Sequence, residues 1–258
     1  MRKYTLNEKY FDEIDSANKV YFLGYLMADG YNSEARGVIE ISCAEKDEAF
    51  LEILNQTIGS SKPLRFVRNK KATSYRISFC SRNISDKLVK LGCVQAKTFK
   101  LKFPSYLNDE MHRHFIRGYF DGDGCVSYTF AKRDNFFGNS FLSVATITST
   151  ETFCLYIKEY IKEKLNINST MLCRHPKHKN NNRTLQISGN RQVIKFLEWI
   201  YLDADLFLKR KREKIDIIQF IIKERNIIVH EIRSKNGKAA IANVNRQRRQ
   251  RNKNVNHA

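Results

Sequence analysis

The stretch that decides the fold is "YFLGYLMADG", residues 21–30, because a near copy, "FIRGYFDGDG", occupies residues 115–124. Both copies are apolar runs interrupted by small residues four positions apart, which places those residues on one face of a helix. Two such faces can approach at backbone distance, so the repeat predicts a pair of buried helices packed on each other. The residues predicted to form this helix interface are Gly24, Ala28, Gly118 and Gly122.

Each copy ends on an aspartate followed by a glycine. Asp29 and Asp123 are predicted on the last helical turn, with Gly30 and Gly124 in the left-handed position after it. A carboxylate there faces the negative end of the helix dipole, which costs roughly 0.3–1 kcal/mol, and two packed helices would bring two such carboxylates together. A hard divalent cation, above all Mg²⁺, is the natural counter-charge, because it binds few carboxylates together with waters and phosphate oxygens.

The segments that follow the two copies are also alike, which indicates an internal duplication. Each copy precedes strand-like alternation, then a helical period, a hairpin with a basic turn, and a second helical period. The fold class predicted is α+β, with the order helix, two strands, helix, two strands, helix used twice. The segments concerned are residues 36–47, 48–59, 64–81 and 82–93 in the first half, and 125–132, 140–149, 150–165, 171–189 and 191–204 in the second.

Pro104 breaks regular structure between the two units, so the boundary is placed there. We expect an N-terminal half at residues 1–104, a C-terminal half at 105–224 and a basic tail at 225–258. Residues 233–258 hold eight Lys or Arg and no acid. The tail is either a solvated charge run or an additional DNA-contacting arm.

Charge and composition narrow the classes of partner. The 258-residue chain has a formal net charge of +19 and a pI near 9.7, which points to a polyanion, either nucleic acid or an anionic membrane surface. A membrane surface is disfavoured because the basic residues are spread over strands and hairpins and do not gather on one amphipathic face. With no apolar run near 18 residues and no CxxC pair among six cysteines, we expect a soluble, intracellular protein with reduced thiols, its compartment unknown.

At these residues the sequence resembles the LAGLIDADG homing endonucleases, of which "FLGYLMADG" and "IRGYFDGDG" look like the two motif copies in a single-chain member. The resemblance implies a monomer of two pseudo-symmetric αββαββα halves, with the motif helices at the interface and two saddle-shaped antiparallel sheets on the DNA major groove. It implies hydrolysis of both strands of a long asymmetric target, leaving short 3′ overhangs, and a role in intron homing. The cofactor implied is Mg²⁺ or Mn²⁺, and the implied metal ligands are Asp29, Asp123, Ala28 and Gly122.

The resemblance also implies a basic residue beside each metal. Lys97 and Lys211 occupy the expected places and, with Asp29 and Asp123, complete the implied catalytic set. The neighbouring basic residues leave a plain phosphate-contacting cluster as the alternative. These neighbours are Lys100, Lys102, Lys209 and Arg210.

Two features depart from the family pattern or leave it open. Met27 stands where many motifs carry a first acid, whereas the second copy keeps Asp121 at this usually structural position. A polar residue that ends the second strand of each half often holds a water in the active site. The candidates for it are Cys43, Ala44 or Glu45 in the first half and Thr148 or Ser149 in the second.

Contacts to DNA are expected from alternate strand residues and hairpin tips, since a pleated surface presents every second side chain. The candidates are Asn32, Ser33, Arg36, Arg65, Arg68, Lys70, Tyr75, Arg76, Tyr128, Lys132, Arg133, Arg174, His175, Lys177, Lys179 and Arg183.

A second function is compatible with the same residues. A non-cleaving nucleic-acid-binding protein, either an intron RNA maturase or a transcriptional regulator, could use this fold, and intron RNA would suit the basic tail as well as DNA would. Loss of one of the two motif aspartates would favour that reading, but both are present.

Overall fold

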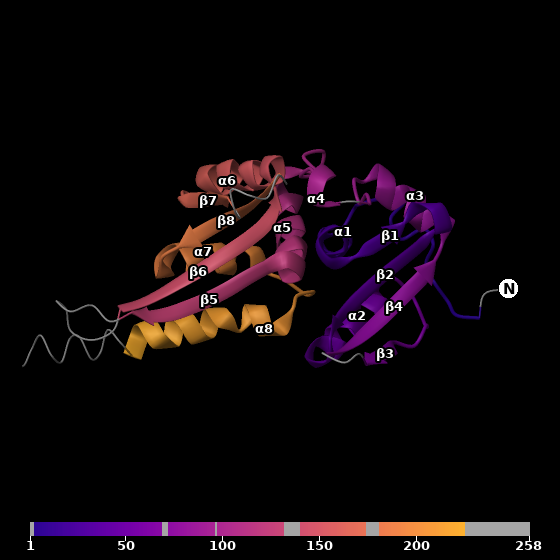
Figure 1. The fold of residues 1–258 in the computed structure, drawn as a ribbon, viewed down its shortest axis with the longest axis horizontal. Helices are drawn as coiled ribbons and strands as arrows, with labels where there is room; N and C mark the ends of the chain where they lie inside the picture. Colours follow the sequence, from indigo (N-terminus) through magenta and orange to yellow (C-terminus); the bar gives the residue numbers. More distant parts are fainter. Residues whose placement is uncertain (1–2, 69–71, 96, 132–139, 174–180, 225–258) are drawn as a thin grey trace, which may run out of the picture.

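Two helices, α1 (Ala17–Asp29) and α5 (Asp109–Asp123), pack side by side at the centre of the molecule (Figure 1). The computed structural model describes residues 3–68, 72–95, 97–131, 140–173 and 181–224. Both helices are buried along nearly their whole length, as their all-round apolar sequences predict. They contain the two copies of the repeated motif, and Asp29 and Asp123 are their last residues.

The two central helices touch backbone to backbone because glycine stands at each crossing point. A Cβ atom on Gly24 would lie 2.3 Å from the carbonyl oxygen of Phe115, and one on Gly118 would lie 2.0 Å from that of Tyr21. A Cβ on Gly122 would lie 2.4 Å from the Cβ of Ala28. These contacts are reciprocal between the two motif copies, so the helix interface predicted from the small residues is confirmed, with a pseudo-twofold arrangement.

Each half folds as predicted, with a four-stranded antiparallel sheet covered by helices. In the first half the sheet order is β1-β2-β4-β3, and in the second it is β5-β6-β8-β7. The α+β fold of two αββαββα units is thereby confirmed. The first half contains β1 (Tyr31–Ser33), β2 (Val38–Ala44), α2 (Glu48–Thr57), β3 (Arg65–Arg68), β4 (Thr73–Cys80) and α3 (Arg82–Lys90), with 3-10 turns at Glu34–Arg36 and Glu45–Asp47. The second contains β5 (Gly124–Ala131), β6 (Ser140–Thr150), α6 (Glu151–Leu165), β7 (Ser169–Cys173), β8 (Asn182–Ser188) and α7 (Asn190–Tyr201).

Two short helices follow the two units and matter for the site. α4 (Lys97–Lys100) lies between the halves in sequence, and α8 (Lys209–Arg212) follows α7, with a further helix at residues 214–224. The division of the chain at Pro104 falls between α4 and α5, and the domain limits stay a prediction. The basic tail at 225–258 lies outside the described residues.

Burial alternates along the strands, so each sheet has one face against helices and one facing away from them. In β2, Ile39, Ile41 and Cys43 are buried, whereas Ser42 and Ala44 are exposed. This period of two fixes which side chains each sheet presents to a partner. In the described part of the chain no helix is long and apolar enough to cross a membrane.

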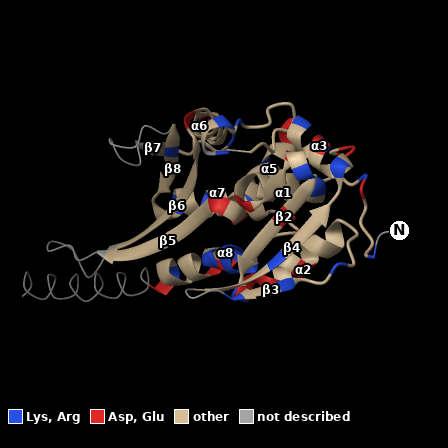
Figure 2. Cartoon of the chain, turned by 45° about the vertical axis from the view of Figure 1, so that its right-hand side comes forward, with Lys and Arg blue, Asp and Glu red and all other residues tan. Residues whose placement is uncertain are grey.

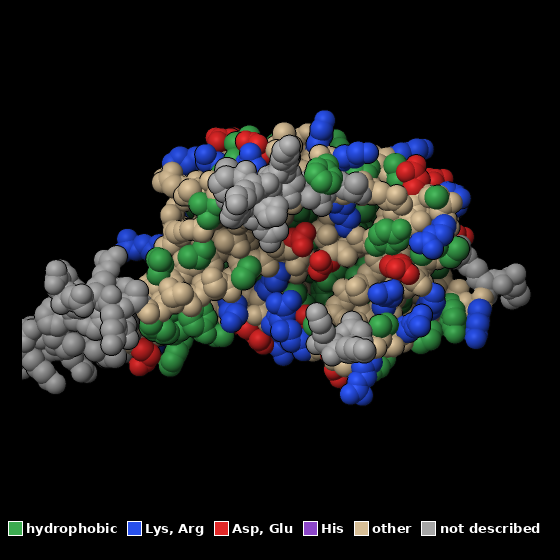
Figure 3. Space-filling model, in the orientation of Figure 1, with side chains coloured by type: hydrophobic (Ala, Val, Ile, Leu, Met, Phe, Trp, Pro, Cys, Tyr) green, Lys and Arg blue, Asp and Glu red, His purple; other side chains and the backbone are tan. Residues whose placement is uncertain are grey.

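Charged side chains are unevenly placed. α8 is a run of four basic residues, KRKR, and is blue in Figure 2. On the face seen in Figure 3, acidic side chains lie at the centre, where the two halves meet, with basic side chains above and below them. Acidic and basic side chains therefore meet at the junction of the halves on this face.

The glycines after the motif aspartates are not in the left-handed conformation, which corrects the sequence prediction. Gly30 has φ −74° and ψ 157°, and Gly124 has φ −77° and ψ 157°, both extended. Glycine is required there for space: a Cβ on Gly30 would lie 2.6 Å from the Leu26 side chain, and one on Gly124 would lie 2.3 Å from that of Phe120.

Replacing either crossing glycine should unfold the interface. We expect Gly118→Ala and Gly24→Ala each to lower the free energy of unfolding by about 3 kcal/mol or more, because the added methyl group meets backbone that cannot move aside. Urea titration followed by circular dichroism would measure this, with Glu159→Ala on the exposed face of α6 as the control. Wild-type stability in both glycine variants would contradict the packing described.

Candidate active site

A lysine closes the end of the first motif helix. The Nζ of Lys97, in α4, donates hydrogen bonds to the carbonyl oxygens of Leu26 at 2.8 Å and Ala28 at 3.1 Å, and also to that of Gly30. Carbonyls in the last turn of a helix have no partner within the helix and form its negative end. The ammonium group therefore neutralises the end of α1 beside Asp29.

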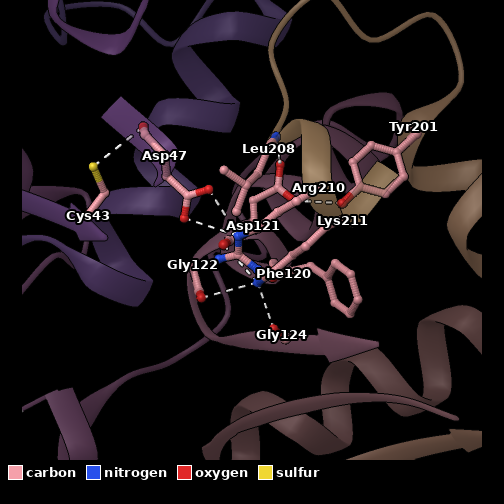
Figure 4. Close-up of polar contacts among 10 residues, drawn as sticks. All are labelled: Cys43, Asp47, Phe120, Asp121, Gly122, Gly124, Tyr201, Leu208, Arg210 and Lys211. Atoms are coloured by element: carbon pink, nitrogen blue, oxygen red, sulfur yellow. Dashed lines mark hydrogen bonds and ion pairs between the residues drawn. The ribbon is translucent and has the colours of Figure 1, made fainter. Parts of the chain in front are cut away.

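A second lysine does the same for the other motif helix (Figure 4). The Nζ of Lys211, in α8, donates to the carbonyl oxygens of Phe120 at 2.6 Å, Gly122 at 3.3 Å and Gly124 at 2.6 Å, and to that of Asp121 at 2.8 Å. The motif positions match those that Lys97 uses on α1. Lys211 is only 5% exposed, and burial lowers its pKa to about 8.

The two lysines place positive charge at the helix ends, where the sequence predicted that the carboxylates and the helix dipoles would need it. The expected counter-charge at the helix ends was a metal ion, but the protein itself supplies part of it. Among the described basic residues near each position, Lys97 and Lys211 contact the motif helices, whereas Lys100, Lys102 and Lys209 are exposed. Burial lowers the pKa of Lys97, opposed by the charges of Cys93, Asp123 and Asp29.

The two motif carboxylates lie where the ends of α1 and α5 meet. Gly122 packs against Ala28 and the backbone nitrogen of Asp29, so the two C-terminal turns are in contact. Both aspartates reach solvent. The surrounding protein nevertheless raises the pKa of the Asp29 carboxyl by desolvation, against the lowering effect of Lys211, Lys97 and Arg210.

A pocket of about 330 Å³ opens beside Asp123 and combines both halves. Its walls include Ala28 from α1, Lys97 from α4 and Asp123 from α5. It is also lined by Ser149 and Asn182, whose Oγ and Oδ1 atoms are buried without a hydrogen-bond partner. Buried polar atoms without partners are uncommon, and these two belong to residues that line the pocket at Asp123.

The residues around the two motif aspartates fit a metal ion that is bound partly by the protein and partly by a phosphate group. Within the described ranges, no three His, Cys, Asp or Glu side chains are grouped to hold a metal ion by themselves. Mg²⁺ does not need such a cage, because it keeps several waters and uses one or two carboxylates plus phosphate oxygens. Asp29 and Asp123, with the neighbouring carbonyls of Ala28 and Gly122, supply oxygen donors of this kind; the lysines already hydrogen-bond those two carbonyls.

Strand register decides which residues end the second strand of each half. Tyr31 pairs with Glu40, and the equivalent Cys125 pairs with Thr146, so Cys43 corresponds to Ser149. The Cys43 thiol is buried, donates to the carbonyl of Asp47 at 3.5 Å, and has its pKa raised to about 11 by burial. The two carboxylate sites therefore differ: one has a thiol where the other has a hydroxyl.

Each lysine-bearing segment is also held by the opposite half. Asp47, which precedes α2 and is 9% exposed, accepts from the Nε of Arg210 at 3.0 and 3.1 Å (Figure 4). Thr150, the residue before α6, donates from its Oγ1 to the carbonyl of Leu101 at 2.6 Å. Asp47 and Thr150 each stand just before a helix of the opposite half, but one contact is an ion pair and the other a neutral hydrogen bond. Sequence analysis missed the ion pair because its members lie 163 residues apart.

Among the described residues, a buried polar network at the helix interface centres on Asp121 and Arg117 of the second motif copy. Asp121, 1% exposed, accepts from Tyr21 of α1 at 2.8 Å, from Tyr201 at 2.6 Å and from the backbone nitrogen of Leu208 at 2.8 Å. Arg117, fully buried, donates to the carbonyls of Leu206 at 3.0 Å and Ile200 at 3.1 Å. The last of these donors, the backbone nitrogen of Leu208, belongs to the segment that leads directly into α8, so the network anchors the approach to Lys211.

Several residues expected to contact DNA are placed elsewhere by the fold. Asn32 and Ser33 are each 3% exposed, and Asn32 is occupied by hydrogen bonds with Ser85 and Cys93. Their interior position contradicts the prediction that they contact DNA. The structure describes no side chains for Lys70, Lys132, Arg133, Arg174, His175, Lys177 or Lys179, which lie outside the described residues.

Strand alternation places three further candidate DNA contacts on the helix-facing side of the sheets. Tyr75 shares the face of buried Ile77 and packs against the core. Tyr128 also packs there, with the Nζ of Lys214 lying 5.2 Å from its ring centre. Arg183 is opposite Ser149 and forms an ion pair with Glu151 at 3.0 Å. All three lie on the face that packs against the helices, whereas DNA was expected on the other.

Four arginines of the first half are exposed, namely Arg36, Arg65, Arg68 and Arg76, but Arg68 shares the sheet face of Tyr75. Arg65 and Arg76 are directly opposite each other in the β3–β4 ladder. Like charges in this position destabilise a sheet. The sheet keeps this pair on its open face, with Glu40 3.8 Å from Arg76, which fits a surface made for a polyanion.

The Asp121 network should make stability depend on pH. Burial raises the pKa of the Asp121 carboxyl, although hydrogen bonds from Tyr201, Leu208 and Tyr21 lower it in part. Its contribution to stability is therefore fully present below the unfolded pKa, about 4, and is lost as pH rises through the folded value. We expect the free energy of unfolding of wild type relative to Asp121→Asn to fall with pH in urea titrations from pH 4 upward. A difference that grows with pH would contradict this.

Comparison with known proteins agrees with the geometry. Residues 110–201 match the family model of the LAGLIDADG-like domain. Among curated proteins none matches the sequence.

Three solved structures show the same fold over most of both chains. The I-LtrWI LAGLIDADG homing endonuclease bound to target DNA is 14% identical, covers 86% of this chain and 92% of its own, and has a TM-score of 0.54. I-SmaMI bound to an uncleaved DNA target in the presence of calcium ions is 13% identical, with coverages of 80% and 92% and a TM-score of 0.52. The LAGLIDADG meganuclease I-AabMI bound to uncleaved DNA is 13% identical, with coverages of 82% and 91% and a TM-score of 0.50.

At these identities the likeness shows the fold. Together with the matched domain, it confirms the resemblance that the two motif copies suggested: residues 110–201 form a LAGLIDADG-like domain, and the described chain has the fold of the LAGLIDADG homing endonucleases.

Proposed function

We propose that this protein is a site-specific double-strand DNA endonuclease that acts as a monomer with a divalent metal. It hydrolyses one phosphodiester in each strand of a long asymmetric target and leaves short 3′ overhangs. The observation that carries the proposal is the pair of touching helix ends, each bearing an exposed aspartate and each closed by a lysine that hydrogen-bonds its last carbonyls. A duplex has two strands, and the chain supplies one carboxylate for each.

The protein residues would divide the work as follows. Mg²⁺ or Mn²⁺ held by Asp29 and Asp123, next to Ala28 and Gly122, would activate the attacking water and stabilise the leaving oxygen. Lys97 and Lys211 fix the backbone that carries these groups and add positive charge beside the phosphates. Ser149 and Asn182 line the pocket at Asp123, beside the space that a metal-bound water would occupy.

Double-stranded DNA is the partner that the charge distribution favours. The solved structures of the same fold named above are bound to DNA. In the first half, the opposed arginines on the open sheet face suit phosphates and base edges. We propose intron homing as the biological setting. Non-cleaving binding of DNA or intron RNA would leave the exposed aspartates and the unpartnered atoms of the pocket without a role.

Cleavage in the presence of Mg²⁺ is the first test. We expect wild type to linearise a plasmid from a randomised-site library, and Asp29→Asn and Asp123→Asn each to lower linearisation by about 100-fold or more while binding is kept, because even residues that only support metal ligands are worth 10- to 100-fold. EDTA should abolish cutting. Asp86→Asn, an exposed carboxylate on α3, is the matched control.

Specific binding without cutting in Mg²⁺ or Mn²⁺ would argue for a non-cleaving regulator. A preference for RNA over duplex DNA would argue for a maturase. Cutting that persists in both aspartate variants would place the active site elsewhere.

Loss of each contact that holds a lysine segment should slow the cleavage of a different DNA strand. Asp47→Asn releases Arg210 and the segment of Lys211, whereas Thr150→Val releases Leu101 and the segment of Lys97. We expect each variant to slow nicking of one strand by about tenfold, and the two variants to affect opposite strands. Separately end-labelled strands would show this, and equal slowing of both strands by either variant would contradict it.

A further inference from the structure

The open face of the second sheet carries no charge among its described residues. Strand register places there the side chains that alternate with the buried ones, and none of them is Lys, Arg, Asp or Glu. Two leucines are notably exposed for a sheet face, Leu142 at 43% and Leu172 at 41%. We call this surface the hydroxyl–methyl face; it consists of Cys125, Ser127, Thr129, Leu142, Val144, Thr146, Thr148, Thr170, Leu172, Thr184, Gln186 and Ser188.

The corresponding face of the first sheet is different in kind. It carries Arg65 and Arg76 together with Glu40, and the Nζ of Lys62 donates to Ser78 on the same face. In Figure 3 the surface over β5 and β6 is tan and green, whereas basic side chains lie over the half that contains β2 and β4. Two sheets with the same topology therefore offer different chemistry.

In the DNA major groove, a face with arginines and a face with hydroxyl and methyl groups suit different base pairs. Arginine pairs best with guanine, through O6 and N7, whereas glutamine pairs with adenine, through N6 and N7. The methyl groups of threonine, valine and leucine match only the C5 methyl group of thymine. A face of hydroxyl and methyl groups with one glutamine therefore suits A·T pairs, and a face with two arginines suits sites that contain guanine.

Gln186 is already oriented for such a contact. Its Nε2 donates to the Oγ of Ser188 at 2.8 Å, which fixes the amide and leaves one N–H and the Oε1 atom for a base edge. Thr146 and Thr170 are its neighbours across the two ladders, so the glutamine is flanked by methyl groups. Close by, Thr148 and Thr184 share a hydrogen bond at 3.1 Å, in which one hydroxyl donates to the other without a charged partner.

We propose that the second sheet reads an A·T-rich half-site through methyl contacts to thymine and the Gln186 contact to adenine, while the first sheet reads a guanine-containing half-site through Arg65 and Arg76. The proposal rests on the function proposed above, because it assumes that each sheet faces one half of a DNA target. It makes the target asymmetric in composition, and it makes Gln186 a specificity-determining residue.

Selection by binding, without cleavage, tests the proposal. Duplexes with two randomised half-sites would be selected in Ca²⁺ on wild type, Gln186→Ala and Arg76→Ala. We expect an A·T-rich half-site that loses its adenine preference in Gln186→Ala alone, and a second half-site that loses guanine in Arg76→Ala alone. The two variants thus assign each half-site to its sheet.

Removal of thymine methyl groups gives an independent measurement. With the selected duplex, uracil in place of thymine in the Gln186-dependent half-site should weaken binding by about fourfold per contacted methyl group. The same change in the Arg76-dependent half-site should have little effect. Fluorescence anisotropy at fixed salt would measure both, since affinity for DNA varies strongly with salt.

The possible outcomes separate this inference from the endonuclease proposal. The inference would be overturned, even if the protein cuts DNA, if the half-site that depends on Gln186 is rich in G·C pairs. It would also be overturned if uracil substitution weakens binding equally in both half-sites. Selective binding with the expected composition but no cleavage would uphold it and refute the endonuclease. Absence of sequence-selective duplex binding would overturn both.

Discussion

The structure depends on one contact, the backbone-to-backbone packing of α1 on α5. Glycine at positions 24 and 118 lets each helix press against a carbonyl of the other, at Phe115 and Tyr21. This closeness brings the two helix ends together and with them two carboxylates that would otherwise repel. The lysines that close the helix ends follow from the same constraint, because two negative helix termini placed side by side need positive charge near them.

The core of the fold could be predicted from sequence because its signals are local. The repeated motif, the period-two strands and the helical periods all lie within short windows, and the duplicated order of elements followed from them. The three-residue strand β1 was not singled out, since three residues carry no readable period. The left-handed glycines were wrongly expected because a glycine can be required by space as well as by φ, and only the packed side chains of Leu26 and Phe120 show which applies.

The site was predictable only in part. Asp29, Asp123 and the two lysines were found through the motif and its resemblance to a family, whereas Asp47 and Tyr201 gave no signal because their partners are distant in sequence. The candidate DNA contacts were chosen by residue type, and strand alternation then divided them: Arg65 and Arg76 face outward, but Tyr75, Tyr128 and Arg183 face the helices. A one-residue uncertainty in register is enough to reverse such an assignment.

The one-sided network around Asp121 has a consequence for the history of the chain. In the first motif the positions equivalent to Arg117 and Asp121 are Leu23 and Met27, and the position in the second motif equivalent to Tyr21 is Phe115. If two copies of the second half paired with each other, each Asp121 would lose the hydroxyl that Tyr21 now donates and would be left under-satisfied in the interior. The two halves are thus no longer interchangeable: the second half cannot form its own symmetric dimer without leaving Asp121 short of a donor.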